Sequence, residues 1–143
     1  MAILDSINAI GHSLIQCTHR TTIELTKDDY LTKKGTCILG IKASKACHDL
    51  TPELKRKIVA GEKIEVVIKV GENIDHFYGY GNKKLTLLST KDLVFRKSNY
   101  ICDRTILIRC TKSSRDLNRS LIKNLTNSKN RISIVFKDND VDE

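Results

Sequence analysis

The sequence has no tryptophan, one proline and only seven aromatic residues among its 143. It therefore has few rings on which nucleic-acid bases could stack, although Tyr78 and Tyr80 would share one face of a strand. No apolar run approaches the roughly 18 residues that a membrane-spanning helix needs, which excludes an integral helical membrane protein. The first residues include Asp5 and no leading Lys or Arg, unlike a secretory signal. We therefore expect a cytoplasmic protein.

Cysteine pairs with metal-ligand spacing are also absent. The five cysteines form no CxxC pair, which argues against a disulfide framework and a structural zinc site. Buried free thiols are the simplest expectation, and pairing of two thiols, as in some thermophiles, is the alternative. The histidines and cysteines do not reproduce a zinc spacing, and no P-loop, dinucleotide fingerprint, GxSxG or HExxH motif occurs. We expect no metal and no cofactor, and no enzyme class follows.

Composition and length predict one globular domain over residues 1–143. Apolar residues make up 40% and charged residues 29%, an ordinary globular balance. The formal net charge is +8, and it is unevenly distributed. Residues 96–131 contain ten Lys or Arg against two Asp, a net charge of +8 in that segment alone. An acidic tail, residues 138–143, offsets part of the remainder.

The chain contains a degraded internal repeat. The stretch 41–50 recurs at 108–117 with Ile, Lys, Asp and Leu matching, and the leucine positions and apolar runs downstream stay collinear. We interpret this as a duplicated unit of about 68 residues. The first repeat covers about 11–78 and the second about 79–137.

Local signals predict one short helix in each repeat. Thr51 is a suitable N-cap, Pro52 fits the first helical position and Gly61 a C-terminal stop, which places a helix near 52–60. Leu54 and Leu121 hold matching positions in the two apolar stripes, so we expect both in the core, and the second helix falls near 118–126. Both helices carry basic residues on their other faces.

The remaining segments alternate or run apolar, which is typical of strands. We predict strands at 14–26, 36–42, 63–70, 73–80, 84–89, 92–97, 104–110 and 131–137. The expected fold class is α+β and β-rich. Two diverged β-α-β-type repeats would form one pseudo-two-fold sandwich or barrel-like domain with two short helices.

The first candidate site is a ligand-binding or catalytic group near the Gly11-His12 turn and the segment 18–22. Its residues are His12, His19, Arg20, Thr22, Lys45 and Asp49. In a regular strand His19 would point inward and Arg20 outward, so we expect His19 to be buried and hydrogen-bonded and Arg20 to reach an acidic partner or an anion. A strand bulge that brings both to one site is the alternative.

Two features of this region recur in the second repeat. Lys45 with Asp49, and Lys112 with Asp116, are i,i+4 pairs, which we expect either to form local salt bridges or to belong to a symmetric anion site. Gly11-His12 has a counterpart in Gly79–Asn82. Both are ordinary glycine turns or places where backbone N–H groups approach an anion.

The second candidate site is a polyanion-binding surface. Lys and Arg neutralise phosphate charge, so the basic segment would suit RNA, although a solvated surface is the simpler alternative. The candidate residues are Arg96, Lys97, Arg109, Lys112, Arg115, Arg119 and Lys123.

A set of short motifs resembles an uncharacterised archaeal family, Domain of Unknown Function 371. The motifs are Thr18-His19-Arg20-Thr21-Thr22-x-Glu24, Leu31-Thr32-x-x-Gly35-x-Cys37-Ile38-x-Gly40, Lys45-Ala46-x-x-Asp49-Leu50 and Arg96-Lys97-Ser98-x-Tyr100. The resemblance implies an archaeal cytosolic protein with a duplicated β-α-β arrangement, and it implies no activity. Our leading hypothesis is a non-catalytic binding domain for polyanions such as RNA. The alternatives are an enzyme or small-molecule binder at the first site and a structural or protein-interaction module.

Overall fold

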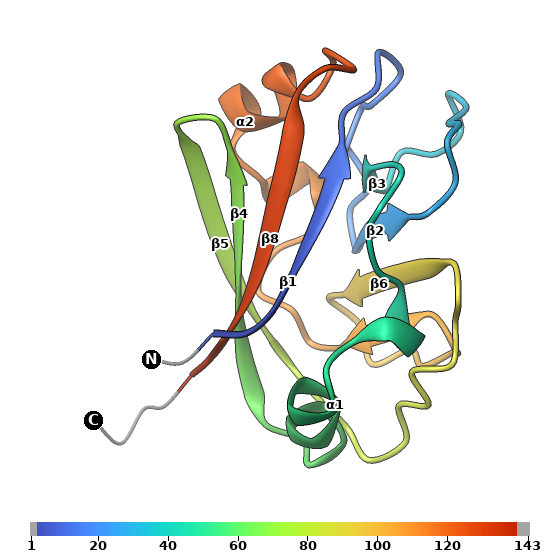
Figure 1. The fold of residues 1–143 in the computed structure, drawn as a ribbon, viewed down its shortest axis with the longest axis vertical. Helices are drawn as coiled ribbons and strands as arrows, with labels where there is room; N and C mark the ends of the chain where they lie inside the picture. Colours follow the sequence, from blue (N-terminus) through green and yellow to red (C-terminus); the bar gives the residue numbers. More distant parts are fainter. Residues whose placement is uncertain (1–2, 140–143) are drawn as a thin grey trace.

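The computed structural model describes residues 3–139, and within them it is rich in β-structure with two short α-helices (Figure 1). The parts of the acidic tail beyond residue 139 lie outside the described residues. In chain order the elements are β1 (Ile3–Ile10), β2 (Thr22–Thr26), β3 (Ile38–Gly40), the 3-10 turn η1 (Cys47–Asp49), α1 (Pro52–Val59), β4 (Lys63–Val70), β5 (Asn73–Tyr80), β6 (Asp92–Arg96), β7 (Thr105–Leu107), the 3-10 turn η2 (Ser114–Asp116), α2 (Arg119–Asn124) and β8 (Arg131–Asp138).

The strands form two four-stranded sheets that close on each other. Sheet A has the order β1-β8-β4-β5, and sheet B has the order β3-β2-β6-β7. Single bridges between Ile10 and Ile41, and between Tyr80 and Ile108, join the edges of the two sheets. The expected β-rich α+β class is confirmed, and these bridges favour a barrel over an open sandwich.

The element order of residues 3–70 occurs again in residues 73–138. Exchanging the two halves, so that β1 replaces β5 and β4 replaces β8, leaves both sheet orders unchanged. The structural boundary therefore falls between β4 and β5, several residues before the position at 78–79 that the sequence pattern suggests. Descent of the halves from one duplicated unit stays a prediction.

The helices begin and end where their local signals predict. Thr51 accepts a hydrogen bond from the Leu54 N–H, and Asn118 caps α2 in the same way through the Leu121 N–H. Leu54 and Leu121 are fully buried, which confirms the prediction that both are core residues. α1 and α2 lie at opposite ends of the barrel and leave the outer face of sheet A uncovered (Figure 1). Neither α-helix in the described part of the chain could span a bilayer.

Two strand predictions are wrong and one strand was missed. Residues 14–21 and 84–89 are loops, because Cys17 and Leu87 each adopt a positive φ, 51° and 53°, that a strand cannot contain. β1 was missed because a register shift between Ile3 and Asp5 interrupts its period of two.

Candidate nucleic-acid interface

The histidines of the first predicted site stabilise their own loop. His12 Nδ1 accepts the N–H of Leu14 at 3.0 Å, and His19 Nδ1 accepts the N–H of Thr21 at 3.2 Å. Both rings are only half-buried. His19 is hydrogen-bonded as predicted. It is half-buried and not buried, and the predicted strand placement is wrong, because residues 14–21 form a loop. These contacts are typical of turn-forming side chains.

Arg20 and Thr22 of the same predicted site differ in their surroundings. Thr22 is buried in β2, and its carbonyl accepts a hydrogen bond from the Ser114 hydroxyl in η2. Arg20 is exposed, and no described residue forms an ion pair with it. The Thr22 hydroxyl lies 3.2 Å from that of Thr21, which is 3.4 Å from His19 Nδ1, so Thr22 is linked to His19 through Thr21. No hydrogen bond or ion pair among the described residues brings the Arg20 side chain to this group.

The glycine turns have a packing role. A Cβ at Gly11 would lie 2.3 Å from the carbonyl oxygen of Leu125 at the end of α2, and a Cβ at Gly81 would lie 1.9 Å from that of Ile58 in α1. Each glycine therefore lets its loop contact the end of the helix from the other half of the chain.

The predicted i,i+4 salt bridge between Lys45 and Asp49 is wrong. Lys45 instead forms a 2.6 Å ion pair with the buried carboxylate of Asp5 in β1, which also accepts the N–H of Thr51 at the start of α1. Asp49 pairs with Lys27 at 2.6 Å. The two predicted partners separate because each meets a tertiary partner from another element.

The second half repeats this arrangement with its own residues. Lys112 pairs with the buried Asp75 of β5, and Asp75 accepts the N–H of Asn118 at the start of α2. Asp116 pairs with Lys97 at 2.9 Å. Hydrogen bonds from the Ser113 backbone, and then from Lys97, lower the pKa of Asp116 to about 2. These ion pairs are part of the fold and leave no symmetric anion site.

Much of the basic 96–131 segment is already bound to protein groups. Arg96 donates from Nε to the Thr105 hydroxyl at 2.9 Å and lies 4.8 Å from the ring centre of Tyr100. Arg119 donates to three backbone carbonyls. Lys97 and Lys112 are ion-paired as described above. Of the seven predicted residues, four are exposed with no ion pair in residues 3–139: Arg109, Arg115, Arg119 and Lys123. Because Arg119 is already bound to carbonyls, the other three remain for an external anion.

Sheet A presents aromatic rings and cations on its uncovered outer face. Tyr78 and Tyr80 are half-exposed there on the edge strand β5. The Lys63 ammonium lies 4.7 Å from the ring centre of Tyr78, and the Arg109 guanidinium lies 4.5 Å from that of Tyr80. We call these four residues the tyrosine strip. It combines the ring faces and the positive charge that single-stranded nucleic acids require.

One carboxylate lies beside the tyrosine strip. Glu65 is opposite Tyr78 in the β4–β5 register, and its Oε2 lies 3.2 Å from Nδ1 of His76. The His76 ring contacts Tyr78 edge-on, with 5.7 Å between ring centres.

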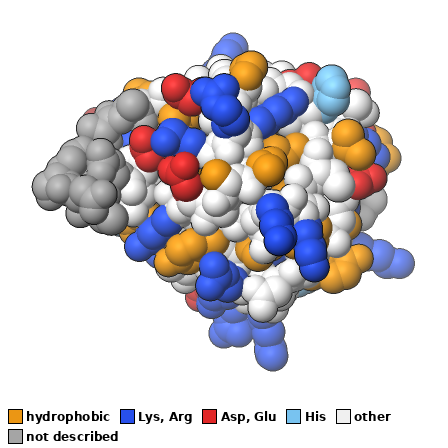
Figure 2. Space-filling model, turned by 90° about the horizontal axis from the view of Figure 1, so that it is seen from below, with side chains coloured by type: hydrophobic (Ala, Val, Ile, Leu, Met, Phe, Trp, Pro, Cys, Tyr) orange, Lys and Arg blue, Asp and Glu red, His pale blue; other side chains and the backbone are white. Residues whose placement is uncertain are grey.

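A basic pocket adjoins the tyrosine strip at the end nearest α1. It has a volume of about 560 Å³ and is lined by Asn82, Lys83, Lys84, Asn99, Ile101, Ile108 and Arg109. Lys83 and Lys84 are exposed and have no acidic partner among the described residues. In the view onto the α1 end, Lys and Arg side chains outnumber Asp and Glu over the lower half of the face (Figure 2). Arg109 belongs to both the strip and the pocket, so the two are continuous.

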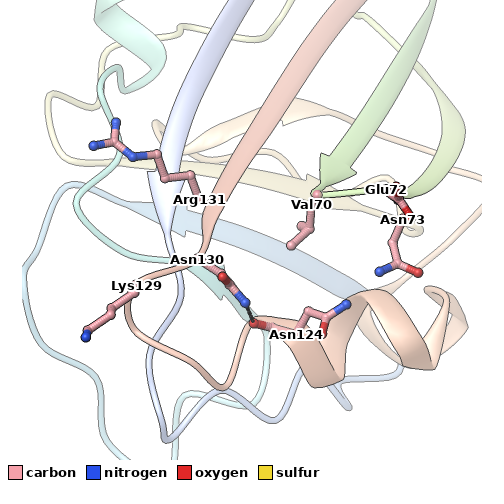
Figure 3. A pocket seen from close by; sticks show the side chains of 8 residues that line it. Val70, Glu72, Asn73, Asn124, Lys129, Asn130 and Arg131 are labelled. Carbon is pink, nitrogen blue, oxygen red and sulfur yellow. Dashed lines mark hydrogen bonds between the residues drawn. The ribbon is translucent and has the colours of Figure 1, made fainter.

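Two further pockets are less suited to an anion. One, of about 500 Å³, lies between the β4–β5 turn and the end of α2, and its Lys129 and Arg131 side chains extend away from Asn73 (Figure 3). The other, of about 390 Å³, includes the carboxylates of Glu53 and Glu62. Cations therefore converge without acidic neighbours only in the basic pocket among these three.

A buried polar cluster lies on the outer side of sheet B. Arg104 Nη1 is 3.2 Å from Asp92 and 3.5 Å from Glu24. Burial and then the charge of Asp92 raise the pKa of Glu24. Asp92 Oδ1 is buried and has no hydrogen-bond partner in the described part of the chain. Because Arg104 is committed to these carboxylates, it contributes little to a polyanion surface.

The five cysteines are free thiols; Cys17, Cys47 and Cys110 are buried as predicted, whereas Cys37 and Cys102 are only half-buried. Burial raises the pKa of Cys37, Cys47 and Cys110 to about 12 and that of Cys17 to about 11. Burial also opposes ionisation of Cys102, but hydrogen bonds from Thr105, the Arg104 backbone and Arg96 lower its pKa to about 7. Within residues 3–139 no three His, Cys, Asp or Glu side chains are grouped as a metal site would require.

Sequence reasoning found part of the interface and missed the rest. It identified Arg109 and the shared face of Tyr78 and Tyr80, but not Lys63, Lys83 or Lys84. The available signal was the Lys-Lys pair directly after the Gly79–Asn82 turn. Lys63 gave no local signal, because only the β4–β5 register places it beside the tyrosines.

The chain folds as a β-rich, barrel-like domain of two sheets joined by single bridges, with an uncovered aromatic and basic face on sheet A. The chain belongs to the family described as Domain of unknown function (DUF371), whose model matches residues 7–138. It is 46% identical over 131 residues to an uncharacterised protein of Methanocaldococcus jannaschii. That match covers 92% of this chain and 95% of the relative. The predicted family resemblance is confirmed, and neither comparison assigns an activity.

Proposed function

We propose that this protein is a non-catalytic RNA-binding domain that holds a single strand along the tyrosine strip. The observation that carries the proposal is the pairing of each ring with a cation, Tyr78 with Lys63 and Tyr80 with Arg109, on a sheet face that no helix covers. Lys63 and Arg109 lie over the ring faces, so bases can stack on the Arg109 guanidinium and on the ring surface that the cations leave exposed, while the positive charges neutralise the phosphates.

The two halves of the barrel support a functional role for these residues. Gly11 and Gly81 hold equivalent positions, because each contacts the end of the helix of the other half. When the halves are aligned on these glycines, Asn8 and Ile10 on β1 match Tyr78 and Tyr80. The same barrel edge is therefore built without aromatic rings in β1. The two tyrosines are therefore a property of β5 that the fold itself does not demand, whereas cations occur beside both edges, with Arg131 opposite Ile10 as Lys63 is opposite Tyr80.

The place of action follows from the same chemistry. We propose that the protein works in the cytoplasm, where RNA is available and thiols stay reduced. Five free cysteines, one of them with a lowered pKa, are in keeping with a reducing compartment.

Fluorescence anisotropy with a labelled single-stranded RNA of mixed sequence tests the proposal across a series of KCl concentrations. We expect binding that weakens as salt rises. Loss of one stacked base costs roughly 1–3 kcal/mol, so Tyr78→Ala and Tyr80→Ala should each weaken binding about 5- to 160-fold.

Tyr30→Ala is the matched control, because Tyr30 is exposed on the surface outside the strip. It should leave the affinity unchanged. Absence of binding at low salt, or binding that does not respond to salt or to the strip variants, would contradict the proposal.

A further inference from the structure

The basic pocket is a preformed cavity held between three loops. Tyr80 and Ile108 exchange two backbone hydrogen bonds of 2.9 Å, which tie the end of β5 to the segment that carries Arg109. The Arg109 N–H in turn donates to the Ser98 carbonyl at 3.0 Å. The loops are therefore fixed relative to one another before any ligand binds.

The pocket offers hydrogen-bond donors, and few protein groups inside it could bind these donors in place of a ligand. Its lining residues include three cations and no carboxylate. Asn82 Oδ1 already accepts the N–H of Lys84 at 2.9 Å, so the amide nitrogen of Asn82 remains as a donor. The Arg109 guanidinium lies over the Tyr80 ring and donates no side-chain hydrogen bond within residues 3–139, so its N–H groups are available to a ligand.

The corresponding region of the first half shows that the fold does not need these charges. Arg109 and Lys42 are equivalent, since each has a positive φ, 48° and 51°, directly after the residue that bridges the two sheets. The positions that match Lys83, Lys84 and Asn99 are Ser13, Leu14 and Asp29. One cation and one carboxylate thus occupy the surface where the second half has three cations.

We infer that the basic pocket binds the terminal phosphate of the RNA strand whose bases lie on the tyrosine strip. This inference rests on the proposed function. A phosphodiester carries one negative charge, whereas a terminal phosphate carries close to two and has three strong acceptor oxygens. Three cations and two amides exceed what one diester can use, and they match a phosphomonoester. The shared residue Arg109 places this end group next to the base on Tyr80.

The experiment compares three RNAs of one ten-nucleotide sequence: one with a 5′-phosphate, one with a 3′-phosphate and one with hydroxyl groups at both ends. Competition against a labelled RNA gives their relative affinities for the full chain. We expect one phosphorylated form to bind at least about tenfold more tightly than the hydroxyl form. Which form it is identifies the end that enters the pocket.

Two charge variants assign that preference to the pocket. The double variant Lys83→Ala/Lys84→Ala should abolish the difference between the RNAs. The matched double variant Lys33→Ala/Lys34→Ala removes two exposed lysines from the first half and should preserve it. All four substitutions are at exposed positions, and circular dichroism checks that each variant is folded.

The experiment distinguishes failure of the terminal-phosphate inference from failure of the proposed RNA binding. Equal affinity for all three RNAs, or a preference that survives Lys83→Ala/Lys84→Ala, would overturn the inference and leave RNA binding in place. Absence of binding by every RNA at low salt would overturn both proposals.

Discussion

Removal of the Arg104 guanidinium tests how the buried acidic cluster is stabilised. Arg104 Nη1 faces Asp92 and Glu24, whose side chains are only 9% and 12% exposed. Arg104→Met keeps the aliphatic stem and removes the ion-pair partner of both carboxylates, leaving only the weaker effects of Arg96 on Glu24 and of Lys91 on Asp92. Loss of one partner of a fully buried pair costs about 3–5 kcal/mol, and the 45% exposure of Arg104 reduces this through solvent screening. We expect a loss of about 2–3 kcal/mol in the free energy of unfolding at pH 7.5.

The loss should depend on pH in a defined direction. Burial, and then Asp92, raise the pKa of Glu24 in the folded state. A carboxyl group whose pKa is higher in the folded than in the unfolded state does not lower the free energy of unfolding at a pH below its unfolded pKa, about 4.3. It lowers that free energy as the pH rises from there through its pKa in the folded state. Without Arg104 the pKa of Glu24 should rise further. The deficit of Arg104→Met should therefore be smaller at pH 4.5 than at pH 7.5.

Urea unfolding measures the free energy of unfolding of each variant at the two pH values. Far-ultraviolet circular dichroism is the signal, because the chain has no tryptophan whose fluorescence could be followed. Arg115→Met is the control, because Arg115 is exposed without an ion pair in residues 3–139, and it should change stability by less than about 0.5 kcal/mol. Glu24→Gln/Arg104→Met should lose much of the pH dependence. A deficit below about 0.5 kcal/mol, or one equal at the two pH values, would refute the reasoning.

Two other predictions follow from close contacts in the barrel. Gly81→Ala places a Cβ 1.9 Å from the Ile58 carbonyl oxygen and should destabilise the fold by about 3 kcal/mol, whereas Gly71→Ala, at a φ of +58° with open space, should cost about 1 kcal/mol. Equal losses in urea unfolding would show that the contact with the end of α1 is not needed. Cys102 should react with iodoacetamide fastest of the five thiols, with a half-maximal rate near pH 7, because its pKa is about 7. Mass spectrometry across a pH series checks this, and a midpoint above 8.5 would contradict it.

The sequence by itself determined the parts of this protein whose signals are local. Thr51 and Pro52 start α1, and the spacing of Leu54 and Leu121 in matching stripes places both in the core. Strands 63–70 and 73–80 follow from their alternation, because a regular strand with one buried face repeats its apolar residues every two positions. The basic balance of the chain and the family motifs are also readable from the residues alone.

Only the tertiary structure determined which charged side chains form ion pairs and which loops are in contact. Lys45 and Asp49 separate because Asp5 and Lys27, distant in sequence, offer better partners, and a local spacing rule cannot include them. The loops at 14–21 and 84–89 alternate like strands, yet the positive φ of Cys17 and Leu87 ends that pattern. The tyrosine strip and the basic pocket depend on the β4–β5 register and on the bridge between Tyr80 and Ile108. Pairing between strands that are distant in sequence sets these contacts, so residues 63, 83 and 109 lie on one surface only in the folded chain.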